Sequence, residues 1–573
     1  MGDINKKDVI KLLETIAIYL ELKGENPFKI SAYRKAAMAL ERDNRSLDDI
    51  EDVRKISGIG KGTAAVIEEY VHHKHSETLQ QLESDVPQGL VPLLKLPGLG
   101  GKKLAKLYQQ LGITDAKTLK AACLDGQVEA LDGFGKKSVE KLVQALDDAG
   151  KRPERLPLAM LIPVAEQIEA YLDTMPSVIT YSRAGSMRRM QETVKDIDYI
   201  ISTTDPATVR DQLLQMTHVK AVIAQGLTKV SLTMAHTYDI NVDFRLVEPE
   251  TFATTLHHFT GSKDHNVAMR QLAKARGEKI SEYGVDVEAT GETLTFRSES
   301  EFFKHFGLQY IPPEVREDTG ETSAFKAPVD LVNRTDIRGD LHMHTTWSDG
   351  GQSVEEMVNQ ARKLGYEYIA ITDHSKYLRV ANGLNETRLR QQCEEINRIN
   401  EKYDDIHVFS GVEMDILPDG SLDFQDAFLQ ELDFVIGAIH SAFNQSEQDI
   451  MKRLFAAMDN PYVSLIAHPT GRLIGRRNGY AVDVHQLIDY AAKTGTALEL
   501  NANPNRLDLS AEWLSIAQKA NVAIAINTDA HSYQMLNHMT YGVGTAQKGW
   551  IKKASVINTW SLNQLQEFLS KKR

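Results

Sequence analysis

The pattern of hydrophobic and polar residues changes character twice along the chain. Up to about residue 150, apolar positions recur with helical spacing and are interrupted by short turns that contain glycine. From about 158 to 320, helical stretches mix with alternating segments such as 196–201 and 239–244, which predict strands. From about 337, short apolar strands alternate with amphipathic helices, a pattern typical of an α/β domain. The chain of 573 residues is therefore predicted to be multidomain.

The segment between the second and third of these regions is polar and rich in turn-forming residues, which is typical of a linker. We therefore expect four parts. They are an α-helical domain over 1–150, an α+β region over 151–317, a linker over 318–336 and an α/β domain over 337–573.

Seven short apolar strands can be identified in the last domain, and nearly every one ends in a residue that can bind a metal. The strands are 339–344, 368–374, 408–413, 434–440, 464–468, 497–501 and 523–531. Such runs separated by helices predict a buried parallel sheet, and functional groups at the carboxyl ends of its strands are typical of a β/α barrel active site. The metal-competent residues are His342, His344, Asp349, His374, Glu413, His440, His468, Asp529 and His531.

Nine such residues exceed the needs of one ion, so we expect a cluster of two or three ions. Mixed histidine and carboxylate ligands favour Zn²⁺, Mn²⁺ or Fe²⁺ over Mg²⁺. A lone histidine in this position would more often be structural, but coincidence does not explain the whole set. Arg472 and Arg476, which follow His468, are candidates for binding a substrate phosphate, although a solvated loop is the favoured interpretation.

A second group of carboxylates occurs in the middle region. Asp196 and Asp198 are two residues apart on a predicted strand, so their side chains point the same way, and Asp243 lies on a second strand. Facing carboxylates are unfavourable unless a cation lies between them, and oxygen ligands select Mg²⁺ or Mn²⁺. Upstream, Gly185, Ser186 and Arg189 offer amide, hydroxyl and guanidinium donors for a triphosphate. The alternative is a pair of solvent-facing aspartates at a strand end.

The helical region contains an internal repeat, a glycine–hydrophobic–glycine turn followed by a helix. Its glycines are Gly58 and Gly60, Gly98 and Gly100, and Gly133 and Gly135, and lysines including Lys102 and Lys136 follow the second and third copies. Free N–H groups at a helix start after such a turn form an anion site. Three copies favour binding of DNA phosphates over ordinary helix–helix turns, and such contacts require no basic domain.

Composition excludes several classes of protein. No apolar run approaches the roughly 18 residues of a membrane span, and the N-terminus has no signal peptide. With only Cys123 and Cys393, a disulfide framework is excluded and a reducing cytoplasm is expected. The net charge of −13 argues against DNA binding through bulk positive charge.

The middle region resembles the palm of family X DNA polymerases. The pattern Gly-Ser-x-x-Arg, Asp-x-Asp and a distant strand Asp is shared with that family, and residues 258–262 are similar to its Tyr-Phe-Thr-Gly-Ser. The resemblance implies that Asp196, Asp198 and Asp243 bind two metals and are catalytic. It also implies nucleotide or template contacts by His258, Phe259, Gly261, Asn266, Arg270 and Arg155, and places the DNA-binding hairpins and a thumb ending near residue 314 in the same family.

Departures from the family pattern affect two expectations. His258 stands where the family has Tyr, and Lys263 where an Asp contacts the base, so nucleotide selection is expected to differ from that of the eukaryotic repair enzymes. Lyase-competent relatives carry a Schiff-base lysine eight residues after the first hairpin glycine. Here that position is Val66, which cannot form an imine, so we do not expect this lyase activity.

The last domain resembles the PHP (polymerase and histidinol phosphatase) domain, a distorted seven-stranded β/α barrel whose nine ligand positions all match. The resemblance implies hydrolysis of phosphoesters at a metal cluster. Across nearly the whole chain it implies a cytoplasmic, monomeric DNA polymerase that fills short gaps with dNTPs in base-excision-type repair. The PHP site would act as a 3′–5′ exonuclease or clean abasic and blocked ends.

Three alternatives remain open from the sequence: an end hydrolase with a vestigial polymerase site, a polymerase with a purely structural PHP domain, and a small-molecule phosphatase. The net charge of −13 includes carboxylates that are proposed metal ligands. Six of the twelve proposed metal ligands are carboxylates whose charge bound cations would balance, so DNA binding is expected to depend on divalent metal.

Overall fold

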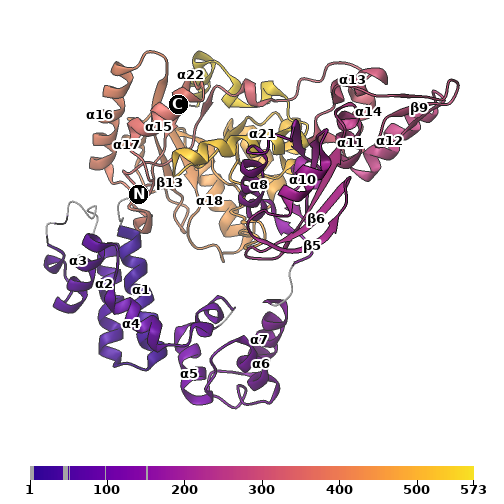
Figure 1. Ribbon diagram of the computed structural model, residues 1–573. Helices are drawn as coiled ribbons and strands as arrows, with labels where there is room; N and C mark the ends of the chain where they lie inside the picture. Colours follow the sequence, from indigo (N-terminus) through magenta and orange to yellow (C-terminus); the bar gives the residue numbers. More distant parts are fainter. Residues whose placement is uncertain (1–5, 43–49, 51, 97–98, 150–152, 573) are drawn as a thin grey trace. The chain divides into compact units, whose positions relative to one another are not determined.

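The computed structural model describes residues 6–42, 50, 52–96, 99–149 and 153–572 (Figure 1). The chain divides into two compact units. One contains residues up to Pro153 with the short segment Leu378–Asn382, and the other contains the remainder. Each unit has apolar cores of its own.

The first unit is built from helices around one apolar core that includes Leu13, Ile16 and Leu104. The helices are α1 (Lys6–Lys23), α2 (Pro27–Arg42), α3 (Lys61–His73), α4 (Glu77–Asp85), α5 (Gly101–Leu111), α6 (Ala116–Leu124) and α7 (Lys136–Ala149). Two short 3-10 segments, η1 (Val53–Lys55) and η2 (Gln88–Lys95), lie between them. Ser76 and Asp115 begin α4 and α6 by accepting bonds from backbone amides of the first turn.

The second unit begins with the palm, a five-stranded sheet in the order β2-β4-β7-β6-β5. Its strands are β2 (Thr180–Arg183), β4 (Ile197–Ser202), β5 (Val219–Gln225), β6 (Lys229–Met234) and β7 (Ile240–Val247), and the small sheet of β1 (Leu156–Pro157) and β3 (Thr193–Val194) adjoins it. Helices α8 (Leu158–Leu172), α9 (Gly185–Arg188) and α10 (Pro206–Leu213) accompany them. The β4–β7 pair is parallel, and the other pairs of this sheet are antiparallel.

The thumb follows the palm and has a core of aromatic and aliphatic side chains that includes Phe302, Phe303 and Ile311. Its helices are α11 (Phe252–Thr260), α12 (Lys263–Lys274) and α13 (Glu299–His305), and β8 (Glu278–Ile280), β9 (Val285–Val287) and β10 (Glu292–Leu294) form an antiparallel sheet. Next come α14 (Glu321–Ala324) and η5 (Arg334–Asp336), in the segment 318–336 expected to be a linker. Leu331 and Val332 of this segment are buried.

The rest of the second unit contains a sheet of seven parallel strands in sequential order. The strands are β11 (Gly339–Asp340), β12 (Tyr368–Ile371), β13 (His407–Asp415), β14 (Phe434–Ala438), β15 (Val463–Ile466), β16 (Ala497–Asn501) and β17 (Ile524–Asn527). A parallel bridge from Met343 to Ala530 joins the ends of the first and last strands, so the barrel is nearly closed. The predicted seven-stranded β/α barrel is confirmed.

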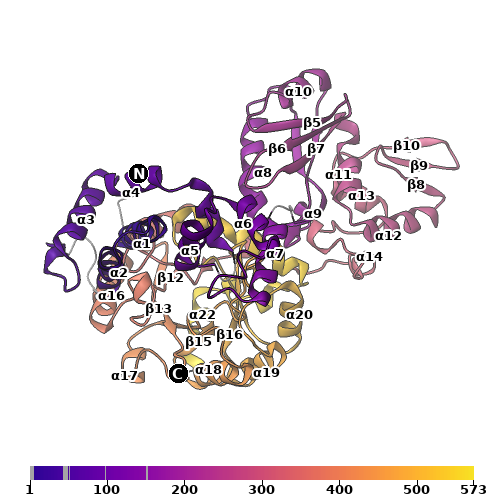
Figure 2. The same cartoon turned by 90° about the horizontal axis from the view of Figure 1, so that it is seen from below.

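Helices cover the outside of the strands (Figure 2). They are α15 (Val354–Lys363), α16 (Glu386–Lys402), α17 (Asp426–Leu429), α18 (Glu447–Asp459), α19 (Val484–Thr494), α20 (Ala511–Lys519), α21 (Met539–Lys548) and α22 (Leu562–Lys571). The strands are completely buried, which explains their continuous apolar runs.

The first barrel strand is shorter than its sequence predicts. The apolar pattern predicts a strand over 339–344, but β11 ends at Asp340. Beyond it, side chains replace strand partners, because the amide of Leu341 donates to Asn527 Oδ1 at 3.2 Å and that of His342 to Asp340 Oδ1 at 3.4 Å. This irregular ending directs His342 and His344 into the barrel mouth.

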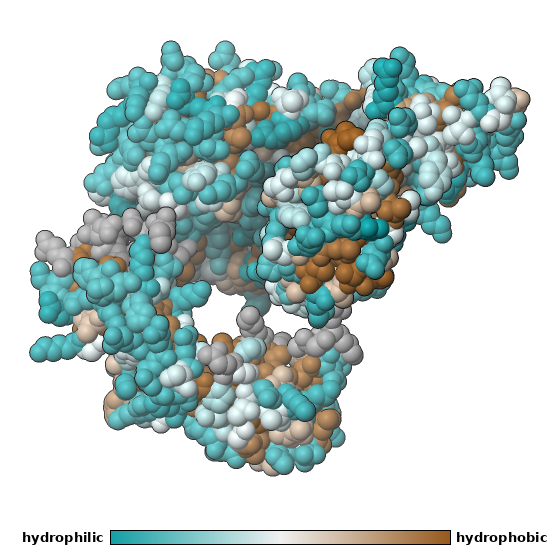
Figure 3. Space-filling model, viewed as in Figure 1, coloured by the Kyte–Doolittle hydropathy of each residue, from teal (hydrophilic) through white to brown (hydrophobic). Residues whose placement is uncertain are grey.

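One surface of the palm carries exposed apolar side chains. They gather around β5, where Val222 and Ile223 are exposed, and in the following turn at Leu227 (Figure 3). β5 is an edge strand of its sheet, which explains why its side chains have neighbours on one side only. Among the described residues, none of the helices combines the length and apolar character needed to cross a membrane.

Candidate active sites

The palm carboxylates lie on two neighbouring strands. Asp198 on β4 is paired in register with Asp243 on the parallel strand β7, and Asp196 immediately precedes β4. Burial, reinforced by the negative charges of Asp196 and Asp243, raises the pKa of Asp198 to about 7. Carboxylates that repel one another in this way are stabilised by a divalent cation, so this donor set fits Mg²⁺ or Mn²⁺.

Lys229 is a member of this cluster that the sequence did not indicate. Lys229 lies on β6, which pairs with β7, and its Nζ is 2.8 Å from Asp243 Oδ2. The ammonium group compensates part of the negative charge when no metal is bound. Its position became evident only once β6 and β7 were paired.

The Gly185–Ser186 turn lies directly against the carboxylates. Gly185 has a φ of +58°, and a Cβ built on it would lie 2.3 Å from Asp198 Oδ2. Only glycine combines this backbone conformation with such a close approach. Ser186 follows Gly185 within the short helix α9, so its backbone lies next to this close contact with Asp198.

The predicted nucleotide contacts converge from the palm and the thumb. A Cβ on Gly261 would lie 3.6 Å from Arg189 Nη1 and 3.8 Å from Asn266 Nδ2, so these three residues adjoin. Asn266 Nδ2 also donates to the carbonyl of His258 at 2.8 Å, and the rings of His258 and Phe259 meet edge to face. Burial lowers the pKa of His258, which favours the neutral imidazole.

Arg155 lies apart from this group, whereas Arg270 lies close enough to His258 for its charge to help lower the pKa of that imidazole. Arg155 precedes β1, and its Nε donates to Thr193 Oγ1 at 3.1 Å on β3. Arg270 lies on α12 with an exposed side chain. Both are therefore at the edges of the palm and thumb surface.

Two glutamates hold the arginines that follow Ser186, and the sequence indicated neither. Glu317 accepts from Arg189 Nε at 2.9 Å, while Arg189 Nη1 donates to the carbonyl of Thr260. Glu299 forms a two-pronged pair with Arg188, at 2.6 and 3.1 Å. Both glutamates belong to the thumb, so they link the Gly-Ser turn of the palm to the thumb.

The hairpin glycines form three turns with the same backbone bond. The amide of the central apolar residue donates to the carbonyl three residues earlier, at 3.1 Å in each of the pairs Ile59–Ile56, Leu99–Leu96 and Phe134–Leu131. Gly58 and Gly133 have φ values of +106° and +92°, which explains the glycine at the first position of their turns. Gly98 lies outside the described residues.

The second glycine of each turn precedes a helix. Gly60 and Gly100 are the N-caps of α3 and α5, and α7 begins directly after Gly135. Lys102 and Lys136 are exposed in the first turns of α5 and α7. Lys61, the first residue of α3, is exposed as well, so each hairpin ends in a helix start that carries an exposed lysine.

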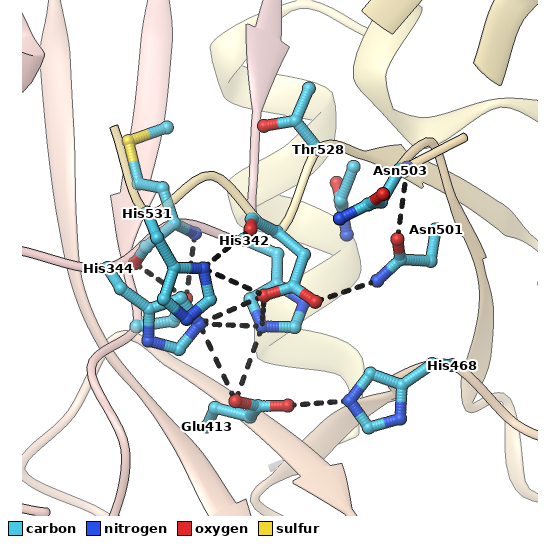
Figure 4. A network of polar contacts seen from close by, with 12 residues as sticks. His342, His344, Glu413, His468, Asn501, Asn503, Thr528 and His531 are labelled. Carbon is cyan, nitrogen blue, oxygen red and sulfur yellow. Dashed lines mark hydrogen bonds and ion pairs between the residues drawn. The ribbon is translucent and has the colours of Figure 1, made fainter. Parts of the chain in front are cut away.

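The nine barrel residues meet at the carboxyl ends of the strands. Figure 4 shows His342, His344, Glu413, His468 and His531 of this set pointing toward one another. Their donor atoms form three overlapping groups that could each hold an ion. These are His344, Asp349, His374 and His531; His342, His344 and Asp529; and His374, Glu413 and His440. His468 joins them, because its Nε2 lies 2.9 Å from Glu413 Oε1.

The barrel cluster has the properties of a metal site. His344 Nδ1 and His468 Nδ1 are buried and have no hydrogen-bond partner among the described residues, which is unfavourable unless another group binds them. Burial lowers the pKa of His344 to about 3, whereas the charges of Glu413 and Asp415 overcome burial and raise the pKa of His440 to about 10. A divalent cation would replace the proton that this pKa places on His440. Imidazole and carboxylate donors in one buried pocket therefore fit two or three divalent cations.

Second-sphere residues orient these donors. Glu499 Oε1 lies 2.8 Å from His342 Nδ1, and Asp415 Oδ1 lies 3.2 Å from His440 Nδ1. Carboxylates in this position fix the ring and increase its basicity toward a metal. Both residues are completely buried. Asp415 is the last residue of β13, like the ligands at strand ends, whereas Glu499 lies in the middle of β16.

Arg472, one of the two arginines suggested as phosphate contacts, is paired with other residues of the chain. Its Nη2 lies 2.6 Å from Glu192 of the palm, and its Nε donates to the carbonyl of Arg506. Arg476 is exposed. Arg506, which the sequence did not indicate, lies beside the cluster, with its Nε 3.8 Å from Asp529 Oδ2.

Comparison with known proteins accounts for this arrangement. Family models match four segments: a helix-hairpin-helix domain at 4–76, a SAM-like helix-hairpin-helix tandem at 91–148, the DNA polymerase beta thumb at 255–317 and the PHP domain at 340–529. The DNA polymerase/3′-5′ exonuclease PolX of Bacillus subtilis is 57% identical over 568 residues, which cover 99% of this chain and 100% of that protein. The chain belongs to the PolX family.

Other relatives match parts of this PolX chain. A probable phosphatase of Thermoanaerobacter sp. is 27% identical over 245 residues, 41% of the chain and 95% of the phosphatase. DNA polymerase lambda of Rattus norvegicus is 23% identical over 336 residues, 54% of the chain and 56% of that polymerase. The predicted membership of family X with a PHP domain is therefore confirmed.

Proposed function

We propose that the chain fills short gaps in DNA with dNTPs at the palm and trims or cleans 3′ ends at the PHP cluster, in base-excision-type repair. Membership of the PolX family makes it a DNA polymerase and a metal-dependent phosphoesterase that acts on DNA through its hairpin domains. The observation that carries the proposal is the presence, in one chain, of a facing carboxylate set in the palm and a complete nine-residue donor set in the barrel. The chain is proposed to act as a cytoplasmic monomer.

At the palm, Asp196, Asp198 and Asp243 would hold Mg²⁺ or Mn²⁺. When bound, such ions lower the pKa of an attacking hydroxyl group and neutralise phosphate charge. The chain itself would bind the triphosphate with the Gly185–Ser186 turn and Arg189, and Phe259, Gly261 and Asn266 would hold the sugar and base. Asp243 lies on the central strand β7, where its carboxylate is suited to meet the primer 3′-hydroxyl group.

At the barrel, His342, His344, Asp349, His374, Glu413, His440, His468, Asp529 and His531 would hold two or three Zn²⁺, Mn²⁺ or Fe²⁺ ions. Glu413 is central, because four histidines lie within 3.5 Å of its two oxygens. Burial of this carboxylate keeps water from competing for its oxygens, and Glu499 and Asp415 keep two of the imidazoles oriented. Arg506, at the side of Asp529, is suited to contact a phosphate of the DNA.

A gapped duplex with a 5′-labelled primer tests the two assignments. Asp196→Ala is expected to abolish extension with dNTPs, and the double variant His342→Ala/His344→Ala is expected to lose both bound metal and 3′ trimming while extension continues. Extension that survives in the first variant would show that the palm assignment is wrong. Unchanged trimming in the second would exclude the barrel as the hydrolytic site.

A further inference from the structure

Helix α21 of the barrel packs against the palm within the second unit. Tyr541 packs against the apolar cluster of the palm core. A Cβ on Gly544 would lie 2.6 Å from Met190 Cγ, so a larger residue would separate the two surfaces. The helix ends at Lys548, close to the residues that hold Arg189.

Lys548 has a buried ammonium group at the end of a partly exposed side chain. Its side chain is 22% exposed, and its Nζ has no hydrogen-bond partner among the described residues. Its ion-pair partner is Glu317, with 3.8 Å between Nζ and Oε1. Burial lowers the pKa of this lysine, against the opposing effect of Glu317. An ammonium group that loses its water in this way is unfavourable unless it stabilises a neighbouring charge.

Glu317 is shared between several donors. The same Oε1 accepts from Arg189 Nε at 2.9 Å and from Gln191 Nε2 at 2.5 Å. Arg189 has a side chain that is only 13% exposed, and its Nη1 donates to the carbonyl of Thr260. One carboxylate of the thumb therefore holds a guanidinium group of the palm, and a lysine of the barrel lies next to it.

We propose that Lys548 is a positioning residue for nucleotide binding at the polymerase site. By sharing the charge of Glu317, it weakens the hold of that carboxylate on Arg189 and leaves the guanidinium group available to a triphosphate. It also adds a positive charge close to the place where the phosphates bind. The barrel therefore contributes to the polymerase reaction through this lysine. The inference rests on the proposed role of Arg189 in binding the triphosphate.

The test is steady-state gap filling by the full chain, with Lys548→Met compared with Lys548→Arg. Removal of the charge is expected to raise KM for the dNTP about 3- to 30-fold, the range expected for a unit charge at this depth, with kcat changed by less than about twofold. Lys548→Arg retains the charge and should keep the KM of the wild type. Lys571→Met, which changes an exposed lysine of α22, is the matched control and should leave KM unchanged.

A second variant separates charge sharing from loss of structure. If Lys548 acts by balancing Glu317, then Lys548→Met combined with Glu317→Gln should bring KM back to within about threefold of the wild type. An equal effect of Lys548→Met in the presence and absence of Glu317 would overturn the proposal. A lower thermal midpoint shared by the Met and Arg variants, with KM unchanged, would show that the lysine is merely structural.

Failure of this inference is distinguishable from failure of the proposed function. If Arg189→Gln leaves KM for the dNTP unchanged, the proposed triphosphate contact is wrong. If Arg189→Gln raises KM and Lys548→Met does not, the contact stands and the role of Lys548 is refuted. In each variant 3′ trimming should proceed at the wild-type rate, because Lys548 is not among the barrel donors.

Discussion

Replacing Glu499 by Gln should weaken metal binding in the barrel without a change in side-chain size. Glu499 Oε1 faces the ring nitrogen of His342 at 2.8 Å and accepts from Asn527 at 3.1 Å. Its Oε2 accepts from the amide of His468 at 2.7 Å and from Asn501 at 3.3 Å. A glutamine has one acceptor oxygen, so in either orientation its NH₂ group would face buried donors that the carboxylate now satisfies.

The size of the expected loss in metal affinity follows from this loss of an acceptor oxygen. A buried donor left without an acceptor costs about 1–3 kcal/mol, which corresponds to a factor of about 5 to 150. Loss of a second-sphere carboxylate typically lowers metal affinity about 10- to 100-fold, in the same range. We therefore expect the apparent affinity of the barrel for Mn²⁺ to fall about 10- to 100-fold in Glu499→Gln.

The assay is equilibrium dialysis against a series of Mn²⁺ concentrations, followed by metal analysis and by 3′ trimming at each concentration. Glu367→Gln, which changes an exposed glutamate paired with Arg338, is the control and should behave as the wild type. Gap filling by the same preparation should be unchanged, because the palm carboxylates do not contact Glu499. A Mn²⁺ affinity within twofold of the wild type would refute the reasoning.

Three further outcomes are expected. Burial alone would raise the pKa of Glu299, but Arg316 and Arg188 outweigh it and hold that pKa well below 4.5. Glu299→Gln should therefore lower the free energy of unfolding by about 3–5 kcal/mol at neutral pH. The difference in thermal midpoint between the wild type and Glu299→Gln should narrow as the pH falls below 4.5, because protonation of Glu299 removes its stabilising ion pairs from the wild type. A difference that stays constant with pH would contradict this prediction. Asp198→Asn should raise the midpoint of the metal-free protein at about pH 8, because it removes a carboxylate whose pKa burial raises to about 7, and should abolish extension. Lys136→Ala should weaken DNA binding equally for all sequences. It should also lower the slope of log affinity against log salt concentration by about one, as expected for the loss of one phosphate contact and as measured by anisotropy at several salt concentrations.

Much of the fold could be predicted because it repeats short local patterns. The barrel strands are apolar along their whole length and end in His, Asp or Glu, so the strands and the donors were recognised together. The palm aspartates follow the two-residue period of a strand, and the pairing of Asp198 with Asp243 follows from the parallel β4–β7 pair. The predicted ends of several barrel strands were wrong. The strands β12, β14, β15 and β17 end at Ile371, Ala438, Ile466 and Asn527, before the predicted metal ligands. The strand β11 ends at Asp340, beyond which side-chain acceptors replace strand partners.

The contacts that tune the sites could not be predicted in the same way. Glu192 and Arg472 are 280 positions apart in sequence, and Lys548 meets Glu317 only because α21 packs against the palm and thumb. Single charged residues on helix ends and turns have no period, so each is indistinguishable in sequence from a solvated side chain. Glu499 was an exception, since a carboxylate in the middle of the buried apolar strand β16 stands out in the sequence.

Two separate metal centres with opposite reactions on one DNA end are the central claim, and the products of a single reaction test it most directly. A 5′-labelled primer in a gapped duplex is incubated with dNTPs and Mn²⁺, and Asp243→Asn is compared with Glu413→Gln. We predict only products shorter than the primer from Asp243→Asn, and only longer products from Glu413→Gln. If either variant loses both kinds of product, or neither variant loses any, the two centres do not act as separate sites and the account is contradicted.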